Sequence, residues 1–90
     1  MVGLIVALSD GIYIVHLKFD DRLRLRRLTD GRIRMLPQRS LQLWVASGAA
    51  FVLARRPGRF AEMPASTVAA LHSRLHFKEV PCLSDLSPGA

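Results

Sequence analysis

Cysteine is nearly absent from this 90-residue chain, since Cys82 is the only one and no internal disulfide can form. Long hydrophobic runs are missing too. The apolar stretch 2–8 is interrupted by Ser9, Asp10 and Gly11. It is therefore too short for a signal peptide, and no segment approaches the roughly 18 apolar residues of a membrane span. These features favour a soluble, cytoplasmic protein that has no membrane partner.

The common motifs of enzyme sites are missing as well. The sequence has no Gly-rich phosphate loop, no nucleophile elbow and no recognised set of metal ligands. His72 and His76 lie four residues apart, but no second ligand pair accompanies them, and surface or helix-end histidines explain this spacing. The aspartates are mostly in candidate turns, where they hydrogen-bond their own backbone. We therefore expect no catalysis, cofactor, metal or small-molecule substrate.

Negative charge is scarce. Thirteen Lys and Arg residues against seven Asp and Glu give a formal net charge of +6. The segment 18–59 holds eleven of the bases and three of the acids, so eleven minus three leaves +8 there. Clustered positive charge attracts polyanions over about 10 Å at ordinary salt. Eleven of the bases are arginines, which suit phosphate and carboxylate, although a GC-rich genome explains the same preference.

Tight-turn signals divide the first part of the chain into segments of strand length. The turns are predicted at Asp10-Gly11, at Asp20-Asp21 and around Asp30-Gly31. The predicted strands are 2–8, 12–19, 22–26, 32–35, 41–46 and 49–54. In the segment 41–54, alanine allows a helix as the alternative. Alternation in the second strand predicts one common face for four residues, which are Tyr13, Val15, Leu17 and Phe19.

One good helix candidate follows, from Pro64 to about Phe77, because Val68, Leu71 and Leu75 share one helical face. The expected fold is mainly β (α+β): a small antiparallel meander or SH3-like barrel of five to six strands with one C-terminal helix. Residues 1–80 would form this single basic domain and 81–90 a flexible tail. The stretch 30–37, Asp-Gly-Arg-Ile-Arg-Met-Leu-Pro, resembles a turn-and-strand unit of SH3-like or Tudor-like barrels, which concerns the fold alone.

Arginines alternate with apolar residues in two successive predicted strands. We expect these arginines on one face of a hairpin, aligned by a bulge, with Leu23, Leu25, Ile33 and Met35 facing the core. Such a patch suits phosphates or carboxylates, and a solvated sheet face is the alternative. A second basic cluster lies on a predicted loop. The candidate binding residues of both clusters are Arg22, Arg24, Arg26, Arg32, Arg34, Arg55, Arg56 and Arg59.

Two functions fit these features. The first is a nucleic-acid-binding module that contacts phosphates of DNA or RNA, largely independently of sequence. The second is a small inhibitor of phage or mobile-element type that binds an acidic surface of a host protein complex, for example a defence or transcription machine.

Association with a partner is expected in either case. Half of the residues are hydrophobic, more than the thin core of so small a domain readily buries. We expect a homo-oligomer or a hetero-complex. The interface with this partner is predicted in the segment 41–53, where Trp44 would point away from the core toward the partner.

Overall fold

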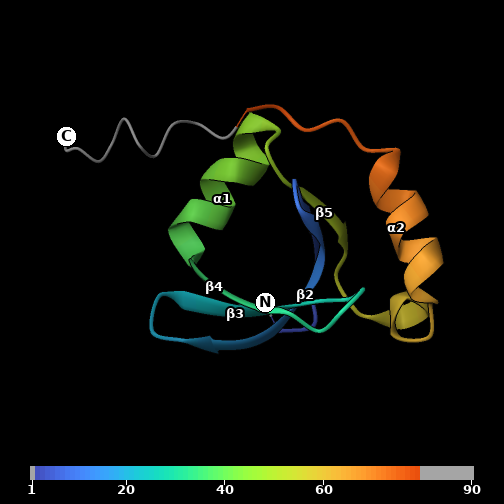
Figure 1. Ribbon diagram of the computed structural model, residues 1–90. Coiled ribbons are helices and arrows are strands. Elements are labelled where there is room, and N and C mark those ends of the chain that lie inside the picture. Colours follow the sequence, from blue (N-terminus) through green and yellow to red (C-terminus); the bar gives the residue numbers. More distant parts are fainter. Residues whose placement is uncertain (1, 80–90) are drawn as a thin grey trace.

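The computed structural model describes residues 2–79 and shows an open five-stranded antiparallel sheet with two α-helices (Figure 1). The strands are β1 (Ile5–Leu8), β2 (Gly11–Phe19), β3 (Arg22–Arg27), β4 (Ile33–Pro37) and β5 (Phe51–Ala54). The helices are α1 (Gln38–Ser47) and α2 (Ala65–Ser73), preceded by a short 3-10 helix, η1 (Gly58–Ala61). Cys82 and the expected flexible tail 81–90 lie outside the described residues.

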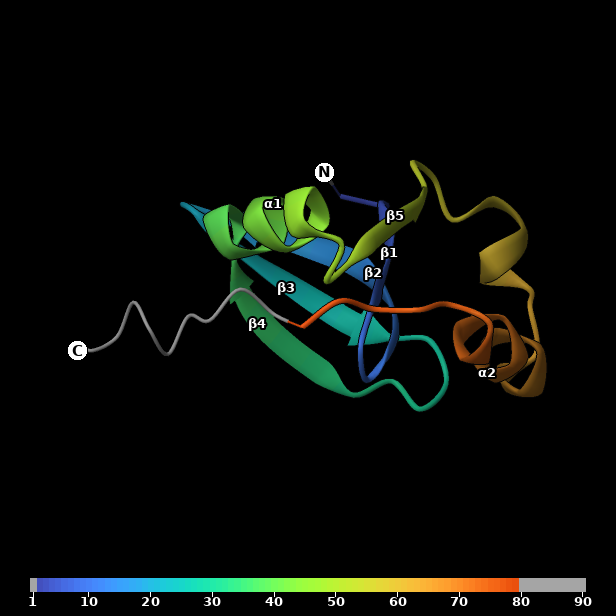
Figure 2. The same cartoon turned by 90° about the horizontal axis from the view of Figure 1, so that it is seen from above.

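The strand order is β4-β3-β2-β1-β5. The first four strands form the predicted meander, α1 then crosses one face of the sheet, and β5 pairs antiparallel with β1 (Figure 2). Strands β4 and β5 are therefore the two edges of the described sheet. The sheet is open, so the predicted antiparallel meander is confirmed for β1 to β4 and the alternative of a closed barrel is wrong. The predicted continuation of the meander to five or six strands is also wrong, because α1 follows β4 and β5 returns to pair with β1.

Helix α1 occupies the segment 41–46 that alternation assigned to a strand. That prediction is wrong because Leu41, Trp44 and Val45 have the spacing of a helix face, and this face packs on the sheet. Pro37 precedes the first helical residue, and Gly48, with φ of +86°, ends the helix in the left-handed conformation. The predicted later helix is confirmed as α2, so residues 2–79 contain two α-helices where one was expected.

The two helices cover opposite faces of the sheet and flank β1 and β5 in Figure 1. Alternate residues of β1 face alternate helices: Val6 and Leu8 pack in the cluster under α1, whereas Ile5 and Ala7 pack in the cluster under α2. Burial of both faces explains why β1 is apolar throughout. Among residues 2–79, no helix is long and apolar enough to cross a membrane.

Candidate functional site

A β-bulge in β2 determines which side chains lie beside the arginines of β3. Strand β2 pairs with β3 in one register up to Val15 and in a shifted register from Leu17 onward, so His16 is an extra residue. The alternation of β2 is inverted beyond this bulge. Leu17 and Phe19 therefore lie on the opposite face of the sheet from Tyr13, and the predicted common face is wrong.

The arginines of β3 and β4 also lie on opposite faces. Arg24 is directly opposite Met35, whereas Arg34 is opposite the buried Leu25. Arg27 donates its backbone N–H to the Arg32 carbonyl at 2.8 Å, so the four residues 28–31 lie inside this last pair of the hairpin, and no bulge interrupts the β3–β4 register. In such a hairpin, even-numbered residues of one strand lie opposite odd-numbered residues of the other. The candidate arginines of the two strands all have even numbers, so those of β3 and those of β4 cannot share a face. The predicted single arginine stripe is therefore wrong.

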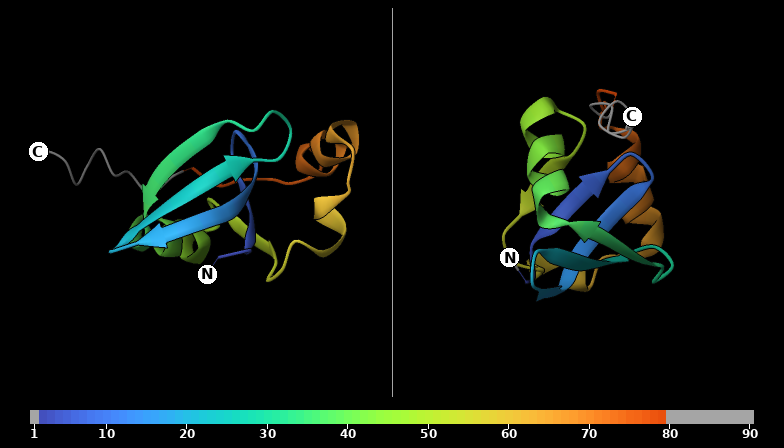
Figure 3. Two further views of the ribbon diagram at one scale, coloured as in Figure 1. Left: turned by 90° about the horizontal axis from the view of Figure 1, so that it is seen from below. Right: turned by 90° about the vertical axis from the view of Figure 1, so that its left-hand side faces the viewer.

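The face of β2, β3 and β4 that is turned away from α1, here called the outer face, has an arginine in each of its three cross-strand rows. Each arginine lies between two apolar side chains. The rows are Ile14–Arg26–Ile33, Leu17–Arg24–Met35 and Phe19–Arg22–Pro37. Seen from below in Figure 3, these strands lie in front, and α2 lies beside them at one end.

The apolar side chains of the outer face are unusually accessible. Leu17 is 44% exposed, Phe19 43%, Ile33 42% and Met35 43%. Within residues 2–79 the three arginines of this face, Arg22, Arg24 and Arg26, form no ion pair. The outer face is therefore an accessible surface that combines free positive charge with apolar area. The sequence pattern missed its apolar half, because Leu17 and Phe19 reach it only through the bulge and Ile33 and Met35 were assigned to the core.

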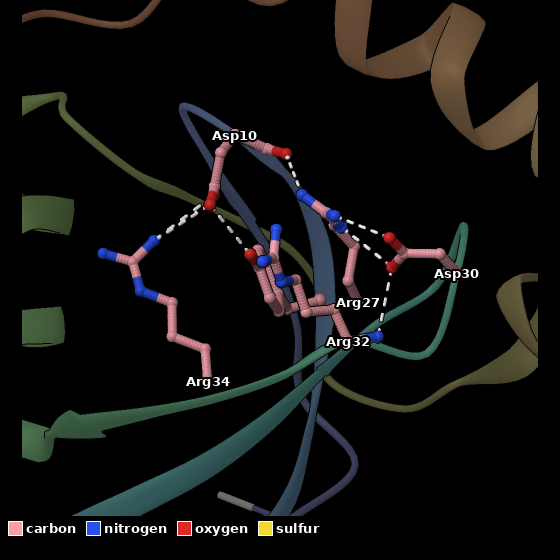
Figure 4. A network of polar contacts seen from close by, with 6 residues as sticks. Asp10, Arg27, Asp30, Arg32 and Arg34 are labelled. Atoms are coloured by element: carbon pink, nitrogen blue, oxygen red, sulfur yellow. Dashed lines mark hydrogen bonds and ion pairs between the residues drawn. The ribbon is translucent and has the colours of Figure 1, made fainter.

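Arg34 is engaged on the α1 side of the sheet. Its Nη1 donates to both carboxylate oxygens of Asp10 at 3.3 Å, and its guanidinium lies 5.5 Å from the centroid of the Trp44 ring. The Tyr13 hydroxyl donates to the same carboxylate at 2.9 Å (Figure 4). Burial, together with the neighbouring Asp10 carboxylate, raises the pKa of Tyr13. Arg34 thus has partners inside the protein and is unlike the arginines of the outer face.

Arg27, which was not among the candidates, holds the β3–β4 loop closed (Figure 4). Its Nε and Nη2 donate to the Asp30 carboxylate at 2.9 and 2.6 Å, and its Nη1 donates to the Asp10 carbonyl at 3.0 Å. This pairing raises the pKa of Arg27 and, with the Arg32 backbone N–H as a further donor at 3.1 Å, lowers the pKa of Asp30 well below its usual range. The side chain of Arg32 is exposed beside this loop.

Trp44 is only 6% exposed and belongs to the core under α1. The prediction that it points away from the core is wrong, because helical periodicity places it beside Leu41 on the face that contacts the sheet. Its indole Nε1 has no hydrogen-bond acceptor among the described residues. In this conformation Trp44 offers a partner little surface.

The second basic cluster lies between β5 and α2, where Arg55, Arg56 and Arg59 are all exposed. A cavity of about 390 Å³ separates this segment from the outer face. We call it the Arg26 cavity, and its walls include Ile14, Arg26, Leu28, Phe60 and Met63. A smaller neighbouring hollow includes Arg56 and Arg59 in its walls.

The described residues contain no group of three or more His, Cys, Asp or Glu side chains that could hold a metal ion. His72 has a structural contact instead, with its Nε2 at 2.7 Å from the Leu8 carbonyl oxygen. No protein-family model, curated protein or solved structure matches this chain. The functional interpretation therefore depends on the geometry of the outer face and of the cavity beside it.

Proposed function

We propose that this protein binds single-stranded nucleic acid on its outer face. The observation that supports this proposal is the arrangement of Arg22, Arg24 and Arg26, each between apolar side chains on the part of the sheet face that extends beyond α2. Guanidinium groups suit the phosphates of the strand, and the apolar side chains suit its sugars and bases.

The spacing of the arginines fits a strand lying along β3. Side chains two residues apart on a β-strand are separated by about 6.8 Å, which is close to the step between successive phosphates of an extended single strand. Three arginines in line can therefore contact successive phosphates without bending the partner. Contacts of this kind carry no base information, so we expect little dependence on sequence.

The apolar rows favour a single strand over a duplex. A duplex presents its phosphates outward and keeps its bases stacked inside, so Leu17, Phe19, Ile33 and Met35 would gain few contacts from it. An unpaired strand offers base faces to these side chains, and the Phe19 ring can stack on one of them.

A protein partner is the second candidate. Phe, Met and Arg are enriched in the centres of protein interfaces, and the outer face exposes all three residue types. A partner with acidic groups spaced among apolar ones would fit, as expected for a small inhibitor of a larger protein complex. The free arginines in a single line, with no acidic residue between them on β3, favour the nucleic-acid strand.

The test is a fluorescence-anisotropy titration with single-stranded RNA, single-stranded DNA and duplex DNA from about 50 to 200 mM salt. We expect the single strands to bind more tightly than the duplex. Arg24→Ala should reduce the slope of log affinity against log salt by about 0.7, since one phosphate contact is lost. The matched control is Arg39→Ala, which removes the same charge from the exposed side of α1 and should leave the slope unchanged.

Each of the two substitutions should change the free energy of unfolding by about 0.5 kcal/mol at most. Thermal unfolding would check this. Two results contradict the proposal. One is the absence of binding to any nucleic acid at the lowest salt, which would leave the protein partner as the better candidate. The other is an equal reduction of the salt slope in Arg24→Ala and Arg39→Ala. That result would indicate that the net charge of the protein attracts the strand and that Arg24 does not belong to a defined binding site.

A further inference from the structure

We infer that the Arg26 cavity receives one unstacked base of the bound strand, with Arg26 holding the adjoining phosphate. This inference depends on the proposed function of the outer face and adds a defined subsite to it.

The cavity lies where the outer face ends. Ile14 and Arg26 belong to the row Ile14–Arg26–Ile33 and also form part of the cavity wall. The carboxyl end of β3 points toward the segment that carries η1 and α2 (Figure 3). A strand that follows Arg22, Arg24 and Arg26 along β3 therefore arrives at the cavity mouth.

Positive charge continues on the far side of the cavity. Arg56 and Arg59 line the neighbouring hollow, which shares Pro57, Phe60 and Met63 with the Arg26 cavity. The phosphates of a strand that places one base in the cavity would thus meet arginines both before and after that base. Among the residues that the structure describes, no acidic side chain lines either depression.

The walls of the cavity fit the chemistry of a base. Ile14, Leu28 and Met63 provide apolar surface, and Phe60 provides an aromatic ring on which a base can stack. The volume of about 390 Å³ is within the range of roughly 300–1,000 Å³ that small-molecule sites occupy. A base with its sugar is a ligand at the lower end of that range.

The two arginines at the cavity have different roles. Arg27 is held by the Asp30 carboxylate and the Asp10 carbonyl, so each of its three nitrogens already donates to a partner within the protein. Arg26 forms no ion pair within residues 2–79 and is exposed at the cavity wall. Arg26 is therefore the cation available to a phosphate or to the face of the base.

Photo-crosslinking of the unaltered protein tests this inference without any question of misfolding. Single-stranded RNA containing 4-thiouridine at every uridine is irradiated in the complex, and the crosslinked peptide is identified by mass spectrometry. This design does not require a single binding register on the strand. We expect crosslinks at Phe60 or Met63 in addition to those on the outer face.

A substitution gives the second measurement. Phe60→Leu keeps the apolar volume and removes the ring, so affinity should fall about fivefold or more, as for the loss of one stacked base. The salt slope should stay unchanged, because no phosphate contact is lost. The matched control is Phe77→Leu, which removes a ring that packs against Phe51 and does not line the cavity. Thermal unfolding of both variants would show whether each retains the fold.

The outcomes separate this inference from the proposed function. Salt-dependent binding with crosslinks confined to the outer face, and wild-type affinity in Phe60→Leu, would overturn the cavity subsite and leave the proposed function intact. Absence of binding to every single strand would overturn both.

Discussion

At the scale of single residues, two carboxylates decide which arginines remain available to a partner. Asp30 binds Arg27, and Asp10 binds Arg34 and accepts from Tyr13. These pairs stabilise the two loops at one end of the sheet. The three arginines of the outer face are beyond the reach of both carboxylates, so the structure separates arginines with a structural role from those available for binding.

The Arg27–Asp30 pair predicts a pH-dependent stability. The folded protein lowers the pKa of Asp30 below its ordinary value of about 3.9, so the charged carboxylate stabilises the fold above that pH. This contribution is lost as the pH falls below about 4 toward the lower pKa of the folded state. We expect Asp30→Asn to lower the urea midpoint at pH 7, and this difference from wild type to shrink between about pH 4 and pH 2.

Asp21→Asn is the control for this measurement, because Asp21 lies in the β2–β3 turn at the other end of β3 and forms no ion pair within residues 2–79. It should follow the wild-type profile throughout. A difference between Asp30→Asn and wild type that stays constant from pH 7 to pH 2 would show that the charge of Asp30 does not contribute to stability.

At the scale of elements, the ends of α1 explain how a helix forms in a segment with strand-like alternation. Pro37 blocks continuation of β4, and Gln38 donates its backbone N–H to the Asp21 carbonyl at 2.7 Å where the helix begins. At the other end, Ala49 donates to the Trp44 carbonyl at 2.8 Å after the left-handed Gly48. The helix is therefore bounded at both ends by residues whose backbone preferences favour those conformations.

Gly48→Ala should destabilise the protein by about 1–2 kcal/mol, because a side chain is disfavoured at φ of +86°. The added Cβ would also lie 3.1 Å from the side chain of Lys78. Gly31→Ala is the comparison, since Gly31 has φ of +77° and no atom within 4 Å of an added Cβ. Urea unfolding should show a loss in both variants. An unchanged midpoint in Gly48→Ala would mean that α1 can end without a left-handed residue.

At the scale of the whole molecule, apolar surface remains at a second place, beside the edge strand β5. Leu4, Leu41, Val45 and Val52 line a shallow groove between α1 and β5. Val52 is 45% exposed on β5, and Leu43 is 41% exposed on α1. An edge strand next to exposed apolar side chains is a common place for a second chain to pair. An interface in the segment 41–53 therefore remains a prediction. Its exposed apolar residue is Val52 in place of Trp44.

We expect the protein to self-associate through β5. Light scattering over a range of protein concentrations should show a mass above that of one chain, and Val52→Lys should return it to the monomer because charge on an edge strand opposes pairing. Met35→Lys is the matched control, since Met35 has similar exposure at 43% but lies on the outer face. A wild-type monomer at every concentration would contradict this prediction.

Local sequence determined the order of the first four strands and the turns between them. The turn residues Asp10-Gly11 and Asp20-Asp21 lie where the chain reverses, and the strands between them begin and end close to the predicted residues. These features depend on backbone preferences over a few residues, which a sequence displays directly. The excess of arginine in the middle of the chain is likewise a property of the sequence alone.

Only the tertiary structure decided which face each side chain occupies. A single extra residue at His16 inverts the alternation of β2, and an even-numbered loop places Arg34 on the opposite face from Arg24. The segment 41–46 became a helix because its apolar face could cover the sheet, which turned Trp44 inward. Hydrogen-bond register between strands and burial against distant elements are non-local, so alternation within one segment cannot specify them.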